Sequence, residues 1–327
     1  MKYFAVILLV SVLFGCNNSD RGGDTKDSSN DTTQAVKPVN TVDFNADSAY
    51  NHVKNQVAFG PRIPGTKEHL ECYNYILDNV SKYADTVYTQ NTRILTYDKT
   101  NIPLKNIIAE FNPAAAKRII LCAHWDTRPF ADEDQVDPKK PFDGANDGAS
   151  GVGVLLEIAS KIKALNRKDL GVDLIFFDAE DWGDNTGQVE NSYCLGSQYW
   201  ASKLHRENYK ADFGILLDMV GAPGALFGYD GYSAQVGPQY MSLIWETAKK
   251  AGYGDYFKSF ERGFITDDHL YMHRGTGIPV IDIIDTDPST RSRFGKYWHT
   301  HADNMNAIDR NTLKAVGQTL IEVLAVY

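Results

Sequence analysis

Acidic and histidine side chains recur in this sequence where buried segments end. Asp147 lies in the glycine-rich stretch 143–151, just before an amphipathic segment at 152–165. An acid at the start of a helix could simply be an N-cap. Small neighbours, however, let other groups approach closely. We therefore interpret Asp147 as a metal ligand to which other parts of the chain deliver further ligands.

The other candidates for chemistry follow apolar strands or lie in an aromatic loop; they are His124, Asp126, Glu180, Asp181, Asp218 and His299. Buried neighbouring acids such as Glu180 and Asp181 repel each other unless a cation or a raised pKa relieves them. Each residue alone has an ordinary structural explanation, but the set favours a divalent cation. Carboxylate and imidazole ligands suit zinc. One of the adjacent acids would bind it, and the other would be a general acid or base.

Four apolar strands precede these residues and alternate with helices. The predicted strands are 119–122, 172–177, 213–217 and 279–284, and the predicted helices are 152–165, 197–205, 238–251 and 311–326. This alternation predicts an α/β fold: a single-domain three-layer sandwich whose central twisted sheet is mixed, mostly parallel, and flanked by helices. Ligands bind such sheets beyond the carboxyl ends of the strands, where the acids lie.

The N-terminal half of the folded region has a less regular pattern. We expect helices at 44–54 and 69–83 and strands at 86–96, 106–111 and 118–123. Asn112-Pro113 predicts a hairpin between the last two strands. Two long polar loops follow at 128–142 and 182–193, and the acidic run 132–137 is interpreted as a solvated loop.

Composition excludes several classes of function. The 327 residues carry a net charge of −9 and no cluster of Lys or Arg, which argues against nucleic-acid binding. Motifs for dinucleotide binding, phosphate-binding loops, thermolysin-like zinc sites and serine hydrolases are all missing from the sequence.

The first residues predict export. Residues 1–16 contain Lys2, a short apolar run and then Gly15-Cys16, which resembles the end of a bacterial lipoprotein signal peptide. An ordinary secretory signal is the alternative. Residues 17–41 predict a disordered polar tether, and 42–327 a folded domain. We expect an exported bacterial lipoprotein, anchored to the membrane through lipid on Cys16, at the periplasmic face of the envelope or the cell surface.

Several motifs together resemble the glutaminyl cyclases, which share the zinc-aminopeptidase α/β fold. They are Ala123–Pro129, Asp143–Gly151, Phe176–Asp181, Asp267–His269 and Trp298–Thr300. The resemblance extends over 42–327 and implies a zinc-dependent catalytic domain of cyclase or aminopeptidase type. Its implied substrates are peptides or proteins with N-terminal glutamine, converted to pyroglutamate with release of ammonia. We expect a monomer.

The resemblance also implies a role for each matching residue. Asp147, Asp181 and His299 would hold one zinc, Glu180 would be the general acid/base, Asp218 and Asp267 would support it, Trp298 would wall the pocket, and Trp182 or Tyr193 would supply a second aromatic. Asp181 stands where animal cyclases have Glu.

Two other functions fit the same residues. In two-metal aminopeptidases of this fold, positions matching His124 and Asp218 bind a second zinc, with Asp147 bridging the pair. A non-catalytic surface lipoprotein would instead have lost Glu180 or a ligand, and neither is lost.

Overall fold

The computed structural model describes residues 42–327, so the expected signal peptide with Cys16 and the tether 17–41 lie outside the described residues. The helices are α1 (Ala46–Phe59), α2 (Lys67–Ser81), α3 (Ala149–Lys161), α4 (Leu195–Ser202), α5 (Gly231–Val236), α6 (Pro238–Lys250), α7 (Asp268–Thr276) and α8 (Arg310–Val326), with short 3-10 turns η1 (Ile162–Leu165) and η2 (Met305–Ala307). The strands are β1 (Thr86–Leu95), β2 (Asn101–Phe111), β3 (Lys117–His124), β4 (Leu170–Phe177), β5 (Phe213–Asp218), β6 (Phe227–Asp230), β7 (Phe257–Gly263) and β8 (Val280–Ile284).

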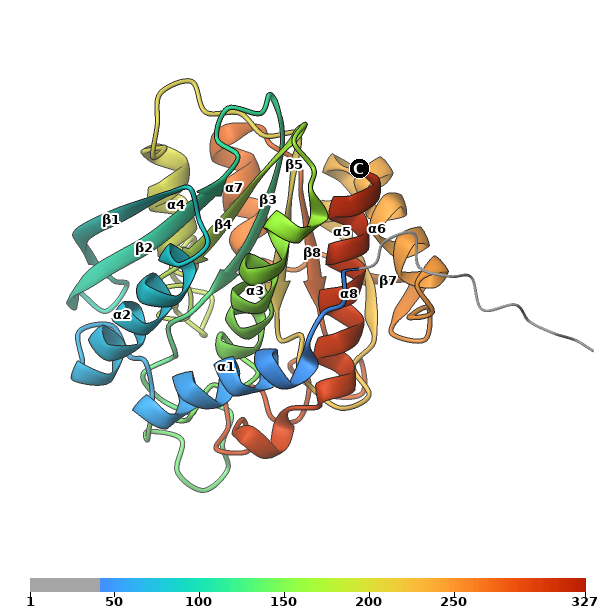
Figure 1. Cartoon of the computed structure of the whole chain (residues 1–327). Helices are drawn as coiled ribbons and strands as arrows, with labels where there is room; N and C mark the ends of the chain where they lie inside the picture. Colours follow the sequence, from blue (N-terminus) through green and yellow to red (C-terminus); the bar gives the residue numbers. More distant parts are fainter. Residues whose placement is uncertain (1–41) are drawn as a thin grey trace, which may run out of the picture. The chain divides into compact units, whose positions relative to one another are not determined.

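A six-stranded mixed sheet forms the centre of this region, in the order β1-β2-β4-β3-β5-β8 (Figure 1). Strands β4, β3, β5 and β8 run parallel to one another, whereas β2 pairs antiparallel with both β1 and β4. The carboxyl ends of β3, β4, β5 and β8 therefore lie at one edge. The predicted α/β fold with a mixed, mostly parallel sheet is confirmed.

The predicted hairpin between β2 and β3 is wrong. Strand β4 lies between them and pairs antiparallel with β2, with Ile107 opposite Phe176. The true hairpin joins β1 to β2 through the turn at 96–100. Asn112 begins the link to β3 in a left-handed conformation, with φ of 50°, and its side chain donates to the carbonyls of Lys168 and Leu170 at the start of β4. A turn signal marks where a strand ends, but not which strand is its partner.

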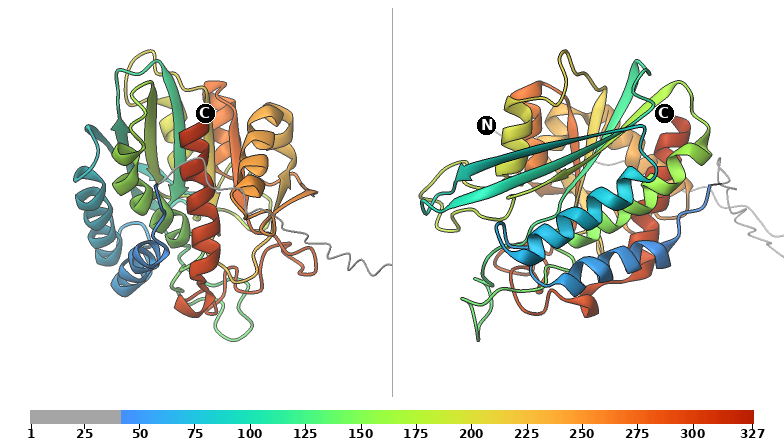
Figure 2. Two further views of the ribbon diagram at one scale, coloured as in Figure 1. Left: turned by 45° about the vertical axis from the view of Figure 1, so that its right-hand side comes forward. Right: turned by 60° about the vertical axis from the view of Figure 1, so that its left-hand side comes forward.

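Alternating strand residues cover the two faces of the sheet. Leu121 of β3 packs in the core shared with α1, α2, α3 and α8, whereas its neighbour Cys122 packs with Trp200 of α4 and Met272 of α7. Figure 2 shows these two groups of helices on opposite sides of the sheet. Because both faces are buried, the central strands are apolar throughout, and the predicted three layers are confirmed.

Part of the chain next to the site was not predicted. Strands β6 and β7 form a separate two-stranded parallel sheet, and α5 and α6 pack against it. Their sequences are short and mix glycine and charge with apolar residues, so they lack a clear period. Within residues 42–327, none of the helices is long and apolar enough to cross a membrane. Cys72, Cys122 and Cys194 are unpaired and buried.

Candidate metal centre and active site

The predicted residues gather where the parallel strands end. His124 is the last residue of β3, Asp218 is the last residue of β5, and Glu180 and Asp181 follow β4. His299 approaches from the loop ahead of α8. The expectation drawn from strand ends is therefore confirmed in space, because all five residues line or border one cavity.

Asp126 fixes the turn that carries the two adjacent acids. Its carboxylate accepts the backbone N–H of Glu180 at 3.0 Å and that of Asp181 at 3.3 Å. The preceding Ala179 has φ of 56°, an uncommon conformation for a residue with a side chain. The sequence made Asp126 a candidate without a role; its role is to hold this turn.

Asp147 is not an N-cap. The N-cap of α3 is Gly148, which has φ of 89° and provides no side-chain cap hydrogen bond. A Cβ at Gly148 would lie 2.7 Å from the carbonyl oxygen of Asp126, so only glycine fits here. Asp303 accepts the backbone N–H of Asp147 at 3.0 Å and thereby orients the loop. The carboxylate of Asp147 is left free to face the site.

Asp147, Asp181 and His299 form one group that could hold a metal ion, with ligand atoms all within 4.8 Å of one another. His299 Nε2 lies 3.1 Å from Asp181 Oδ1 and 3.7 Å from Asp147 Oδ2. Burial lowers the pKa of His299, but Asp181 and Asp132 outweigh it and raise the pKa to about 9. Two carboxylates and an imidazole converge here, as a zinc site requires.

Asp132 holds this histidine from behind. Its carboxylate lies 2.9 Å from His299 Nδ1 and also accepts from the Arg128 guanidinium at 2.8 and 3.0 Å. Arg128 donates in turn to the backbone carbonyl of Asp181 at 2.8 Å. Asp134 also accepts hydrogen bonds, including the backbone N–H of His301. The interpretation of this acidic run as a solvated loop is wrong for Asp132 and Asp134, because both are anchored to the loop that carries His299.

A second group shares Asp147. His124 Nε2 lies 3.0 Å from Asp147 Oδ1 and 3.2 Å from Asp218 Oδ1, and these three residues could also hold an ion. Asp147 presents one carboxylate oxygen to each group. The arrangement has the ligands of a bridged two-metal site, and it equally forms a hydrogen-bonded acid–histidine–acid chain.

Glu180 lines the same cavity as members of both groups. Its side chain is 13% exposed, and His124 Nδ1 lies 3.9 Å from its carboxylate. Burial raises the pKa of Glu180 well above its usual value; His124 opposes the shift, and Asp181 and Asp267 add to it. The Cys194 thiol donates to Oε1 at 3.2 Å. A carboxyl group that takes up a proton this readily is suited to acid/base work.

Asp267 is the N-cap residue of α7, and its side chain lies near Glu180. Burial, and then the charge of Asp218, raise its pKa to about 7. Asp218, Asp267 and Glu180 all line the same cavity. The structure therefore brings the predicted supporting acids together with the predicted acid/base.

The cavity has a volume of about 1050 Å³ and an aromatic wall. Trp298 stacks on His299 with ring centroids 3.7 Å apart, and Tyr193 also lines the cavity. Phe264, which is 61% exposed, also lines the cavity and was missed because its strand-end position carried no recognised motif. Placing Trp182 in the pocket was wrong. Its ring lies in a separate apolar cluster with Leu195, outside the cavity lining, and its indole N–H donates to Asp98 at 3.4 Å.

Comparison with known proteins agrees with this site. Residues 106–324 match peptidase family M28. The chain belongs to that family. A glutaminyl cyclase from Porphyromonas gingivalis is 47% identical over 86% of this chain and 98% of its own, with a TM-score of 0.83. A zinc-dependent exopeptidase from Parabacteroides distasonis is also 47% identical, over 87% of this chain and 99% of its own, with a TM-score of 0.84. The glutaminyl-peptide cyclotransferase of Drosophila melanogaster is 27% identical over 276 residues, 77% of this chain and 73% of its own.

Membership of M28 and these neighbours imply that the chain uses a metal, of which zinc is the type named for the Parabacteroides protein. Sequence reasoning also missed the supporting residues Asp132 and Asp303 of this M28 chain. Each contacts its partner across more than 150 positions, at sequence separations of 167 and 156. An acid in a polar loop gives no local signal of such a contact.

Proposed function

We propose that the chain is a zinc-dependent glutaminyl-peptide cyclotransferase acting on peptides and proteins with N-terminal glutamine. The observation that carries the proposal is the position of Glu180, a largely buried carboxyl group with a raised pKa, which lines the same cavity as the Asp147–Asp181–His299 group and Trp298. The near full-length similarity to a glutaminyl cyclase supports it.

Asp147, Asp181 and His299 fit one zinc ion. His299 is held by Asp132 through Nδ1, which leaves Nε2 as the ligand atom, and the two carboxylates supply oxygen. This pattern, in which a carboxylate orients a ligating histidine, is common at zinc sites. A zinc ion bound here supplies a Lewis acid for the γ-carbonyl oxygen of the substrate glutamine.

Glu180 performs the proton transfers of the reaction. As carboxylate it takes a proton from the α-amine while the amine nitrogen bonds to the γ-carbonyl carbon. It then returns the proton to the side-chain nitrogen as the carbon–nitrogen bond breaks and ammonia leaves. Asp267 helps to raise the pKa of Glu180, and Asp218 in turn raises the pKa of Asp267.

Positioning is the other contribution of the protein. Both reacting groups belong to one residue, so the site has to hold the ring-closing conformer and exclude competing water. Trp298 offers a flat apolar wall beside His299 for the compact glutamine side chain. No water nucleophile is required, so one catalytic zinc is sufficient.

A zinc aminopeptidase is the second candidate. The His124–Asp147–Asp218 group could hold a further ion, and two metals would activate water for hydrolysis. The similarity to the zinc-dependent exopeptidase from Parabacteroides distasonis supports this second candidate.

One experiment separates the two. The purified protein is incubated with a Gln-initiated peptide and, separately, with an aminoacyl chromogenic amide. A mass loss of one ammonia with every residue retained is the expected result. Release of the first residue or of the chromophore would instead establish the peptidase, and no change in either substrate would refute both.

The proposals of export and membrane anchoring are based only on residues 1–16 of the sequence. We propose that lipid on Cys16 anchors the protein to the envelope and that the catalytic domain is a monomer. Cys16→Ser should move the protein from the membrane fraction to the soluble fraction. Unchanged membrane fractionation of this variant would argue against the anchor.

A further inference from the structure

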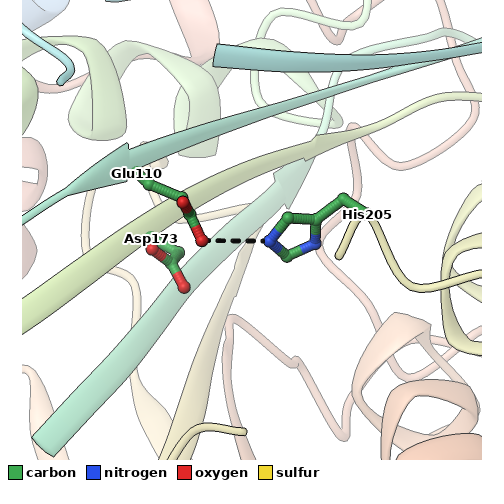
Figure 3. A group of neighbouring side chains, drawn as sticks. All are labelled: Glu110, Asp173 and His205. Carbon is green, nitrogen blue, oxygen red and sulfur yellow. Dashed lines mark hydrogen bonds and ion pairs between the residues drawn. The ribbon is translucent and has the colours of Figure 1, made fainter. Parts of the chain in front are cut away.

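Asp147, Asp181 and His299 are called the triad below. Two other buried groups, which share no residue with the triad, also combine a histidine with two acids. The first, Glu110, Asp173 and His205, lies on β2, β4 and the segment after α4 (Figure 3). Trp200 donates its indole N–H to His205 Nδ1 at 3.2 Å, so the proton of a neutral ring is on Nε2, which faces Glu110 at 3.2 Å.

The acids of this first group are also satisfied. Asp173 accepts from Arg118 through one carboxylate oxygen and from Tyr209 through the other. Glu110 accepts from Arg206 at 2.8 Å as well as from His205. No nitrogen lone pair is left to bind a metal, so the first group is a hydrogen-bonded ion-pair network.

The second group has a different hydrogen-bond pattern. His269 Nε2 lies 3.0 Å from Asp230 Oδ2. Asp230 also accepts the backbone N–H groups of Ser233 and Ile265 at 2.7 and 2.9 Å, and the Ser233 hydroxyl at 2.9 Å. A carboxylate that accepts from so many donors is ionised and makes Nε2 the donor. The lone pair of His269 is therefore on Nδ1.

That lone pair points into a buried pocket of acids. His269 Nδ1, both carboxylate oxygens of Asp282 and Oδ2 of Asp267 have no hydrogen-bond partner among residues 42–327. His269 and Asp282 are each 1% exposed, and Asp267 is 4% exposed. Leaving such groups unpaired costs about 1–3 kcal/mol each, and more when they are charged.

We propose that Asp267 Oδ2, His269 Nδ1 and the Asp282 carboxylate bind a divalent cation of the zinc type, at a site separate from Asp147, Asp181 and His299. Their ligand atoms lie within 4.8 Å of one another. Nδ1 and Asp282 Oδ2 are 3.7 Å apart, too far for a hydrogen bond. Two ligands on one tetrahedral zinc are separated by about 3.4 Å, given bonds of about 2.0–2.2 Å.

The surroundings match those of a metal site. Asp230 orients His269 as a carboxylate orients ligating histidines elsewhere. Imidazole nitrogen favours zinc over magnesium or calcium. Asp267 lines the substrate cavity, which gives the ion a path to the interior. An ion there would hold Asp267 beside Glu180, so it would stabilise the geometry of the catalytic acids without touching substrate.

Zinc content of the full chain tests the site. The protein is stripped with a chelator, saturated with Zn²⁺, dialysed and analysed for zinc per chain. His269→Gln and Asp282→Asn should each bind about one zinc ion fewer than the wild type. The matched controls, His205→Gln and Asp173→Asn in the satisfied group, should keep the wild-type content. Wild-type content in both ligand variants would overturn the proposal.

A further variant separates this site from a second catalytic metal. His124→Gln would lose an ion if the additional zinc lay with Asp147 and Asp218, and should keep it if the ion lies with His269. Folding of each variant is checked by circular dichroism. A variant that does not fold leaves the decision to wild-type crystals grown with zinc. Anomalous density among Asp267, His269 and Asp282 would support the site, and its absence at full occupancy of the triad would exclude it. Cyclase activity is measured separately, so either proposal can fail alone.

Discussion

His299 and Asp132 are joined by a contact of 2.9 Å between Nδ1 and the carboxylate, which directs Nε2 toward Asp181. Arg128 holds Asp132 from the other side. Asp132, in the acidic loop, thus positions the proposed zinc ligand His299. Removing its carboxylate should therefore weaken zinc binding.

Asp132→Asn should weaken zinc binding by about 10- to 100-fold, because substitutions behind ligating histidines have effects of this size. The amide can still accept one hydrogen bond, so the fold should persist. Competition with a chromogenic chelator measures the affinity. Asp137→Asn, in the same loop but paired only with the exposed Lys140, is the matched control and should bind zinc normally. Equal affinities in the two variants would contradict the role given to Asp132.

Glu180→Gln should lower kcat by about 10²- to 10⁴-fold, the usual contribution of a general acid/base. The side chain is nearly isosteric, and Asp126 holds the turn through backbone N–H groups that the change leaves intact. Zinc content and thermal midpoint should therefore match the wild type. The assay is mass spectrometry of a Gln-initiated peptide under single-turnover conditions. Near wild-type turnover would mean that another group transfers the proton.

Gly148→Ala should destabilise the protein and reduce its zinc content. The added Cβ would lie 2.7 Å from the Asp126 carbonyl oxygen and 3.1 Å from the His124 ring, so both must move. Gly252→Ala is the matched control, since Gly252 has φ of 90° but no atom within 4 Å of the added Cβ. Overpacking should cost Gly148→Ala about 1–3 kcal/mol beyond the control. Urea unfolding of both variants would show the difference, and equal losses would assign the effect to φ alone.

The sequence predicts the parts of this site that depend on regular elements. The parallel strands are apolar throughout and end at acids, so the sequence alone places Asp218 and Glu180 at one edge. Asp147 followed from its glycine-rich loop. These predictions succeed because strand direction and burial fix where a strand end lies.

Contacts between distant loops could not be predicted. Asp132 contacts His299 although 167 positions separate them, and neither loop has a periodic sequence pattern from which the contact could be predicted. The predicted pairing of β2 with β3 was wrong for the same reason. Asn112 marks a turn, but the position of β4 between β2 and β3 depends on packing of the whole sheet. The placement of Trp182 failed because its contacts are with Asp98 and the Leu195 cluster, which nothing near Trp182 in the sequence indicates.

His205 should make the stability of the protein sensitive to acid. Burial lowers its pKa, although Glu110 opposes the shift. The folded state therefore binds a proton at His205 less readily than the unfolded state does. Its contribution to stability is complete above the unfolded pKa of about 6.5 and declines as the pH falls below that value.

His205→Gln should consequently lose less stability than the wild type between about pH 7.5 and pH 5.5. The variant is expected to be less stable at the higher pH, because the Trp200 N–H loses its acceptor. Denaturant unfolding at both pH values, with zinc removed from both proteins, measures the four free energies. The wild type should show the larger decrease. A larger decrease in the variant would mean that Glu110 dominates and that His205 is charged in the folded protein, which would also free the Trp200 indole from its partner.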